Sequence, residues 1–133
     1  MKKDIEIPQV KDIYMAVVKE YNEDFHCEDW NAYIINNKET AIEMVLIVSK
    51  GYDEDQLIET SLIRHKIEIL PPKSFAKVEL LQEEVLKLTN FFNVTFFENN
   101  QMFDKKYVFQ KNTIKEGALR SIPLLNKRGI IAK

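Results

Sequence analysis

The sequence predicts a single, mainly β domain over residues 1–133: an immunoglobulin-like β-sandwich of about seven strands with one short helix and an extended C-terminal tail. Two observations predict this fold. Short apolar segments with period-two alternation recur along the chain, and turn-forming residues separate them. The composition, 45% hydrophobic and 30% charged over 133 residues, is that of one globular core. Closed β-barrels have the same signature.

Three strands are expected in the first part of the chain. Residues 12–21 carry apolar side chains at both odd and even positions, which indicates a strand buried on both faces. Residues 30–35 alternate and are followed by two asparagines, which favour a turn. Trp30 on this strand is expected to take a central position in the core. Residues 43–49 are β-branched and aliphatic, and they end just before the turn glycine Gly51.

The middle of the chain is expected to form two more strands and the helix. Residues 60–70 alternate regularly before two prolines, and His65 lies on the apolar face, as a hydrogen-bonded core histidine would. Residues 74–79 alternate as a strand, and the period changes to that of a helix over 81–89, where good helix formers dominate. A single helix over 75–89 is the alternative.

The last expected strands form a hairpin. Residues 91–98 are aromatic and β-branched, two asparagines supply a turn, and residues 102–109 alternate. From residue 111 the periodicity is weak, so residues 111–133 are predicted to be an extended tail that packs on the domain or extends from it. Residues 130–131 are a candidate short edge strand within it.

Charged residues are distributed unevenly. Residues 111–133 hold six basic side chains and one acidic side chain, a net charge of +5. Because the whole chain has a formal net charge of −2, the other residues have a net charge of −7. Acidic side chains concentrate at residues 20–29 and 53–59. The tail is therefore expected to lie back on an acidic body, or else to bind a partner. The partner-binding candidates are Arg120, Lys127, Arg128 and Lys133.

Several enzyme classes are excluded by the glycines. Gly51, Gly117 and Gly129 lie far apart, whereas a dinucleotide fingerprint, a phosphate loop or a nucleophile elbow needs closely spaced glycines. No catalytic residue and no cofactor is predicted. The protein is expected not to be an enzyme.

A metal-assisted hydrolase is the one catalytic alternative, with His26, Cys27 and Asp29 as the candidate ligands in one acidic loop. Ligands so close in sequence rarely surround one ion as a tetrahedron. A nucleophilic dyad of Cys27 and His65 would require the fold to bring the two together.

Location is predicted from three features. The lone Cys27 can form no internal disulfide, and the N-terminal stretch MKKDIEIPQV lacks the apolar run of a signal peptide. The longest aliphatic run, residues 44–48, is far shorter than the roughly 20 residues of a membrane-spanning helix. A cytoplasmic protein without a membrane span is expected.

Nucleic acid is a second class of candidate partner. The basic tail would contact phosphates, and aromatic side chains would form a stacking surface on a sheet. Against this, the whole chain is acidic, with an isoelectric point near 5.8. The aromatic candidates are Phe91, Phe92, Phe96, Phe97, Phe103, Tyr107 and Phe109.

Three stretches carry a resemblance to a family. Residues 29–37 (DWNAYIINN), 64–68 (RHKIE) and 119–124 (LRSIPL) resemble a family of short uncharacterised bacterial proteins. Some members are labelled phenylalanyl-tRNA synthetase alpha subunit, an activity that needs a glycine-rich motif ending in Arg and an Arg-x-Glu loop. Here Arg64 is followed by His and Lys, and Arg120 by Ser and Ile, so the resemblance implies no activity.

The function expected from the sequence is that of a non-enzymatic protein-interaction module. Edge strands and a basic tail suit association with another protein, or with a second copy of the chain. RNA binding through the tail and an aromatic face is the alternative from another class.

Overall fold

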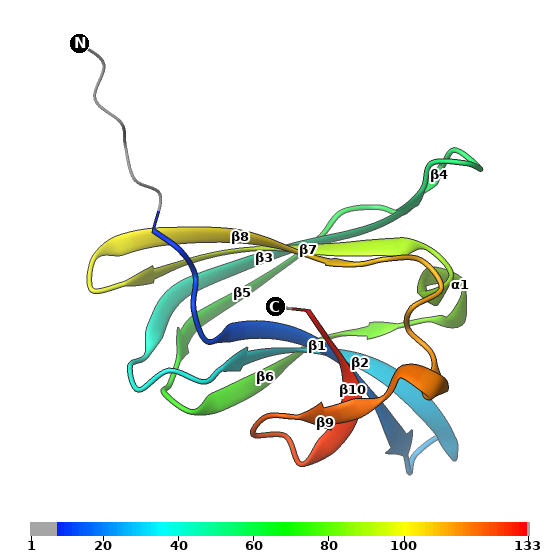
Figure 1. The fold of residues 1–133 in the computed structure, drawn as a ribbon, viewed down its shortest axis with the longest axis horizontal. Helices are drawn as coiled ribbons and strands as arrows, with labels where there is room; N and C mark the ends of the chain where they lie inside the picture. The colour runs from blue at the N-terminus through cyan, green and yellow to red at the C-terminus, as the bar shows by residue number, and fades with distance from the viewer. Residues whose placement is uncertain (1–7, 133) are drawn as a thin grey trace.

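The computed structural model describes residues 8–132 and shows a mainly β protein made of two antiparallel sheets packed face to face (Figure 1). Ten strands, one short α-helix and one 3₁₀ turn make up these residues. None of the helices among residues 8–132 has the length and apolarity needed to cross a membrane.

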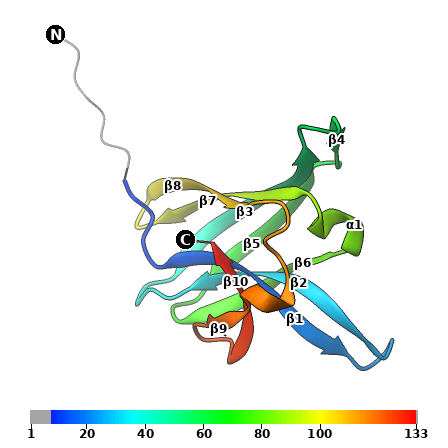
Figure 2. The same cartoon turned by 45° about the vertical axis from the view of Figure 1, so that its right-hand side comes forward.

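The first sheet has five strands in the spatial order β6-β2-β1-β10-β9. Their bounds are β1 Ile13–Asn22, β2 Cys27–Asn36, β6 Ser74–Leu81, β9 Arg120–Ile122 and β10 Lys127–Ala132. The β1–β2 hairpin is paired along its whole length, from Ile13 opposite Asn36 to Asn22 opposite Cys27. Its tip projects well beyond the rest of the sheet (Figure 2).

The second sheet is built around β3. Its strands are β3 Ile42–Asp53, β4 Ile58–Glu59, β5 Ile63–Leu70, β7 Thr89–Glu98 and β8 Gln101–Phe109. One edge of β3 pairs with β7, which in turn pairs with β8. The other edge pairs with β4 near its end and with β5 along the rest. Helix α1 (Glu83–Leu86) joins β6 of the first sheet to β7 of the second.

The main core lies between the two sheets. It is formed by the inward side chains of both, chiefly Ile13, Met15, Val17, Ala32, Ile34, Val45, Ile47, Phe92, Val94, Phe96, Tyr107 and Phe109. The Tyr107 hydroxyl donates a hydrogen bond to the backbone carbonyl of Ile13, which joins β8 to β1 across the core. Burial raises the pKa of Tyr107.

A second, smaller core covers the outer face of the first sheet. Outward side chains of β1 and β2 meet Ile122 and Leu125 of the C-terminal segment there, and Tyr33 contributes its ring. This explains why residues 12–21 are apolar at both odd and even positions.

The prediction of an extended C-terminal tail is therefore wrong. Residues 120–122 and 127–132 form β9 and β10, and β10 pairs with β1. The apolar outer face of β1 drives this docking, because leaving it in water would be unfavourable. Gly129 allows the close approach: a Cβ at this position would lie 2.4 Å from the carbonyl oxygen of Val17.

The other expected elements are found with shifted bounds. The choice of a strand followed by a short helix, rather than one helix over 75–89, is confirmed, with the helix limited to Glu83–Leu86. The expected strand over 60–70 begins at Ile63. Its apolar face is only half covered, so His65 is a half-buried residue rather than a core residue. Trp30 is half-buried against the main core.

Candidate functional site

Strand β5 is an open edge of the second sheet. Among the described residues it pairs only with β3, in a regular antiparallel register from Leu70 opposite Ile42 to Ile63 opposite Ser49. On the same side of the molecule the first sheet ends in β6, whose pairing with β2 is interrupted by a bulge. A bulge disturbs the backbone geometry that another strand would need, whereas β5 keeps it.

The side chains of β5 alternate between apolar and charged. Ile63 and Ile69 are 45% and 59% exposed. Arg64, Lys66 and Glu68 lie on the opposite face, are exposed, and form no ion pair with the residues that the structure describes. The strand thus presents free backbone groups, exposed isoleucines and unpaired charges of both signs.

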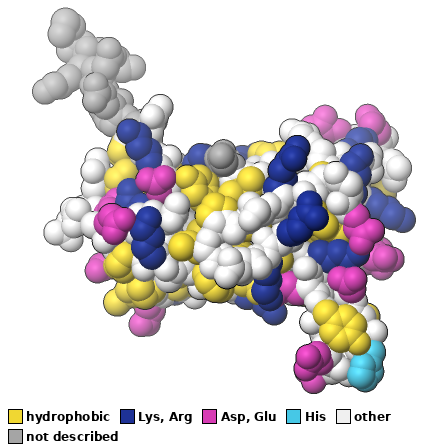
Figure 3. All heavy atoms as spheres, turned by 60° about the horizontal axis from the view of Figure 1, so that its bottom comes forward, with side chains coloured by type: hydrophobic (Ala, Val, Ile, Leu, Met, Phe, Trp, Pro, Cys, Tyr) yellow, Lys and Arg dark blue, Asp and Glu magenta, His cyan; other side chains and the backbone are white. Residues whose placement is uncertain are grey.

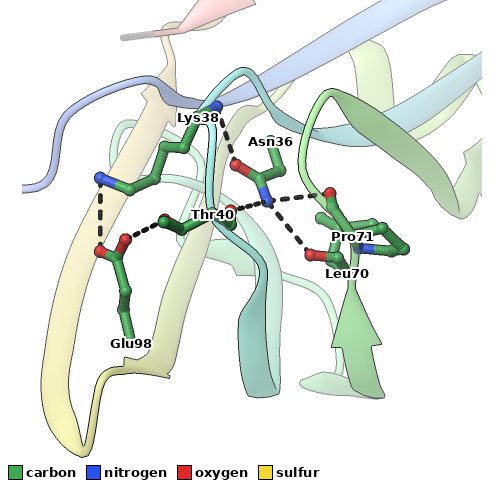
Figure 4. A network of polar contacts seen from close by, with 6 residues as sticks. All are labelled: Asn36, Lys38, Thr40, Leu70, Pro71 and Glu98. Carbon is green, nitrogen blue, oxygen red and sulfur yellow. Dashed lines mark hydrogen bonds and ion pairs between the residues drawn. The ribbon is translucent and has the colours of Figure 1, made fainter.

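A buried amide holds the far end of β5 in place (Figure 4). The side-chain nitrogen of Asn36, which is fully buried, donates to the carbonyl oxygens of Leu70 at 3.1 Å, Pro71 at 3.0 Å and Thr40 at 3.0 Å. The Asn36 side-chain oxygen accepts from the amide of Lys38. The edge is therefore rigidly attached at the turn to β6.

A polar cluster joins the two sheets at this open side. One carboxylate oxygen of Glu79, Oε1, accepts from the Ser49 hydroxyl at 2.6 Å and lies 2.9 Å from His65 Nε2. A carboxylate can only accept, so Nε2 carries the imidazole proton. The hydroxyl and the imidazole both contact Glu79 and not each other, so this is not the arrangement of a nucleophile and its base.

Glu79 reaches this cluster because of the bulge in β6. Ala32 pairs with Glu79 and Tyr33 with Lys77, so Val78 has no partner on β2. After this extra residue, the side chains of β6 point to the face opposite to the one that simple alternation would give them. The glutamate turns inward, and Leu80 turns outward and is 51% exposed. Simple alternation in the sequence predicts that Glu79 points outward and Leu80 inward. The sequence therefore carries no indication that Glu79 and Ser49 belong to a common site.

Beside the cluster lies a hollow of about 270 Å³ between the sheets, next to α1, which we call the cleft. Ser49, Glu79, Asn90 and Phe92 line it. Asn90 is 3% exposed and donates from its side-chain nitrogen to the carbonyl oxygens of Val85 at 2.8 Å and Leu88 at 3.1 Å. It thereby fixes the chain between α1 and β7 as one wall of the cleft.

The basic residues proposed for partner binding are largely engaged within the protein. Lys127 forms an ion pair with Glu20 of β1, and Arg128 donates to the carbonyl oxygen of Leu119. Arg120 is exposed on β9, and Lys133 lies outside the described residues.

The expectation that the basic segment lies back on an acidic body is confirmed. Besides the contact of Lys127 with Glu20, Lys111 contacts Asp53 at 3.4 Å and Asp55 at 3.0 Å. The two acidic clusters of the sequence therefore each meet a residue of the basic segment.

Glu20 is the centre of that contact. Burial by itself raises the pKa of its carboxyl, but donation from Lys127, Tyr33 and Asn31 outweighs it and holds the pKa of Glu20 below its ordinary value. The Tyr33 and Asn31 donors lie 2.7 and 2.8 Å away.

The proposed metal ligands lie at the projecting tip of the β1–β2 hairpin, where acidic, hydrophobic and histidine side chains meet (Figure 3). Cys27 Sγ lies 3.7 Å from one Asp29 oxygen, while His26 Nδ1 lies 3.3 Å from the Tyr21 hydroxyl. Over residues 8–132 no group of three or more histidine, cysteine or acidic side chains is arranged to hold a metal ion.

The thiol of Cys27 is not activated there. Desolvation and the charge of Asp29 raise the pKa of Cys27. His65, the other member of the dyad considered from the sequence, contacts Glu79 instead.

The expected aromatic surface is mostly core. Phe92, Phe96, Tyr107 and Phe109 are buried, and Phe103 stacks on Phe96 with ring centroids 5.1 Å apart. These side chains alternate inward along β7 and β8, so they belong to the core and not to a stacking surface. Of the seven aromatics considered, Phe91 and Phe97 remain half-buried on the outer face of the sheet.

No protein-family model, curated protein or solved structure matches this chain. The resemblance to a family of short bacterial proteins thus stays a prediction. The candidate site rests on geometry alone: the open edge of β5 and the cleft beside it.

Proposed function

We propose that this protein is a protein-interaction module, and that its β5 edge pairs with the β5 edge of a second copy of the chain. The observation that carries the proposal is the charge pattern on an open, regular strand. Strand addition at an exposed sheet edge is a common mode of protein recognition, in which backbone hydrogen bonds supply affinity and side chains supply specificity.

The sequence of β5 is complementary to itself when two copies run antiparallel. With Lys66 at the centre, Arg64 faces Glu68 of the second copy and Ile63 faces Ile69 of the second copy, each twice. With Ile67 at the centre, Lys66 faces Glu68 of the second copy, again twice. In either register opposite charges meet on one face, and in the register centred on Lys66 the two Lys66 side chains also face each other.

Two of the other edges are less suited to this role, whereas β8 is also an edge strand with regular pairing. The pairing of β6 is bulged, and β9 is only three residues long. Exposed basic side chains on an edge strand normally oppose pairing, but Glu68 of β5 faces one of the two, Arg64 or Lys66, in either antiparallel register. A closed pair also covers Ile63 and Ile69, which are large, apolar and exposed.

Two finer descriptions accompany this proposal. An immunoglobulin-like fold is supported by two antiparallel sheets packed over one core. A cytoplasmic location is supported by the single Cys27, which can form no internal disulfide.

Sedimentation equilibrium of the full chain tests the proposal. The wild-type protein is expected to dimerise, and Glu68→Lys is expected to weaken the dimer roughly tenfold or more, because two attractive pairs become repulsive in either register. Adding Arg64→Glu to Glu68→Lys restores dimerisation if Lys66 is at the centre, and adding Lys66→Glu restores it if Ile67 is. Glu23→Lys, at the distant hairpin tip, is the matched control and is expected to change nothing.

Two results would overturn the proposal. One is a wild-type protein that stays monomeric up to about 1 mM, a concentration at which an association of only about 4 kcal/mol is detected. The other is a dimer whose dissociation constant is the same in the Glu68→Lys and Glu23→Lys variants. This result would place the interface elsewhere.

A further inference from the structure

The cleft beside β5 has a polar wall made of side chains from both sheets. Ser49 comes from β3, Glu79 from β6 and Asn90 from β7, so three strands far apart in the sequence meet there. Ser49 and Asn90 are each 3% exposed, and the Glu79 side chain is 12% exposed. Among the described residues no buried side-chain nitrogen or oxygen lacks a hydrogen-bond partner, so an acceptor of this wall that makes no hydrogen bond is accessible from the cleft or from solvent.

The hydrogen-bond donors of this wall are already used. The Ser49 hydroxyl and the His65 imidazole both donate to Glu79 Oε1. Both hydrogens of the Asn90 amide go to backbone carbonyls, those of Val85 and Leu88. Nothing on these residues is left to donate to a ligand in the cleft.

The acceptors, in contrast, remain available. Among residues 8–132 no donor reaches Glu79 Oε2 or the side-chain oxygen of Asn90, and the Ser49 oxygen accepts no hydrogen bond. All three residues line the cleft. Glu79 is the one acidic side chain among the residues that line the cleft.

The other polar side chains at the cleft are Gln82, Thr60 and Lys50, and among these the Gln82 amide forms no hydrogen bond with the described residues. The Thr60 hydroxyl accepts from the amide of Gly51 and donates to the carbonyl of Ser61. Lys50 lines the cleft, but its ammonium group forms an ion pair with Glu59 at 3.1 Å.

The remaining walls are apolar. Phe92 is 1% and Leu81 4% exposed, and Val85 of α1 and Ile63 of β5 complete this side. The volume of about 270 Å³ lies just below the roughly 300–1,000 Å³ that is usual for sites of drug-sized ligands, so the occupant is small.

We propose that the cleft binds a small organic ammonium ion, with its charged nitrogen donating to Glu79 Oε2 and Asn90 Oδ1 and its apolar body against Phe92 and Leu81. A cation with several hydrogens satisfies all the open acceptors at once. A carboxylate or phosphate placed at this wall would meet the carboxylate of Glu79 and the same acceptors. The inference does not require the β5 pairing proposed above, although Ile63 contributes to both surfaces.

Isothermal titration calorimetry of the full chain with phenethylammonium chloride tests the proposal. Saturable one-site binding is expected, and 2-phenylethanol and 3-phenylpropionate, which keep the ring but not the cation, are expected to bind about tenfold more weakly or not at all. Glu79→Gln is expected to lose about tenfold or more in affinity, because the amide still accepts from Ser49 and His65 but carries no charge. Glu84→Gln, an exposed glutamate of α1, is the matched control and is expected to bind as the wild type does.

Each arm can overturn the proposal. Phenethylammonium that does not saturate, or that binds no better than 2-phenylethanol, would contradict it using the wild-type protein alone, even if Glu79→Gln failed to fold. Equal affinity of the folded Glu79→Gln and Glu84→Gln variants, with folding checked by thermal unfolding, would place the binding outside the cleft.

Discussion

Asn36 of β2 donates a hydrogen bond from its fully buried amide to the backbone carbonyl of Leu70, the last residue of β5, at 3.1 Å. The same nitrogen also donates to Pro71 and Thr40. One side chain of the first sheet therefore holds the end of the open edge in the second. The position of the candidate interaction surface depends on this contact.

Replacing Asn36 by Ala is expected to lower the free energy of unfolding by about 2–3 kcal/mol, because buried carbonyls lose their donor and a small cavity remains. Urea denaturation measures this. Asn93→Ala is the control: its amide donates at 2.9 Å to the exposed Asp104, and its loss should cost under about 1 kcal/mol. Equal losses for the two variants would contradict the anchoring role of Asn36.

Replacing Gly129 by Ala is expected to destabilise the protein by about 1–3 kcal/mol, since the new methyl group would lie 2.4 Å from the Val17 carbonyl oxygen and push β10 away from β1. The matched control is Gly117→Ala, because a Cβ there meets nothing within 4 Å. Its effect should stay within about 0.5 kcal/mol. Thermal unfolding of both variants measures the difference, and similar melting temperatures would show that β10 does not pack on β1 as described.

Glu20→Gln is expected to flatten the dependence of stability on pH. The folded-state pKa of Glu20 lies below its ordinary value of 4.5, so its contribution is fully present above 4.5 and is lost as the pH falls through the lower, folded-state value. Urea denaturation at about pH 6.5 and about pH 3.5 should show a smaller acid loss in this variant than in the wild type. Glu23→Gln, at the exposed hairpin tip, should behave as the wild type, and an unchanged acid loss in Glu20→Gln would refute the prediction.

The thiol of Cys27 is expected to react slowly although it is exposed, because its raised pKa leaves less thiolate near neutral pH. Alkylation by iodoacetamide followed by mass spectrometry measures the rate. Asp29→Asn removes the neighbouring charge, lowers the pKa and should speed the reaction, while Glu23→Asn should not. A wild-type rate above that of free cysteine would show that the thiol is activated after all.

Much of the strand pattern followed from the sequence, because alternation reports which side chains face a core. Residues 91–98 and 102–109 match β7 and β8 closely, and the change of period near residue 81 separates β6 from α1. These are local properties, determined by neighbours along the chain.

The candidate site did not follow from the sequence. It depends on the unpaired Val78, which turns Glu79 into the cleft and leaves Leu80 outside. A bulge is set by how two strands match in register and twist, and β6 alone carries no sign of it.

By itself the sequence determined that this is a mainly β protein with a basic C-terminal segment and two acidic clusters, since periodicity and charge are properties of the chain. Only the tertiary structure decided that this segment becomes β9 and β10, that β5 is left as the open edge, and that Ser49, Glu79 and Asn90 meet. The physical reason is that pairing and burial depend on segments far apart in sequence: the apolar outer face of β1 is covered by Ile122 and Leu125 of the C-terminal segment.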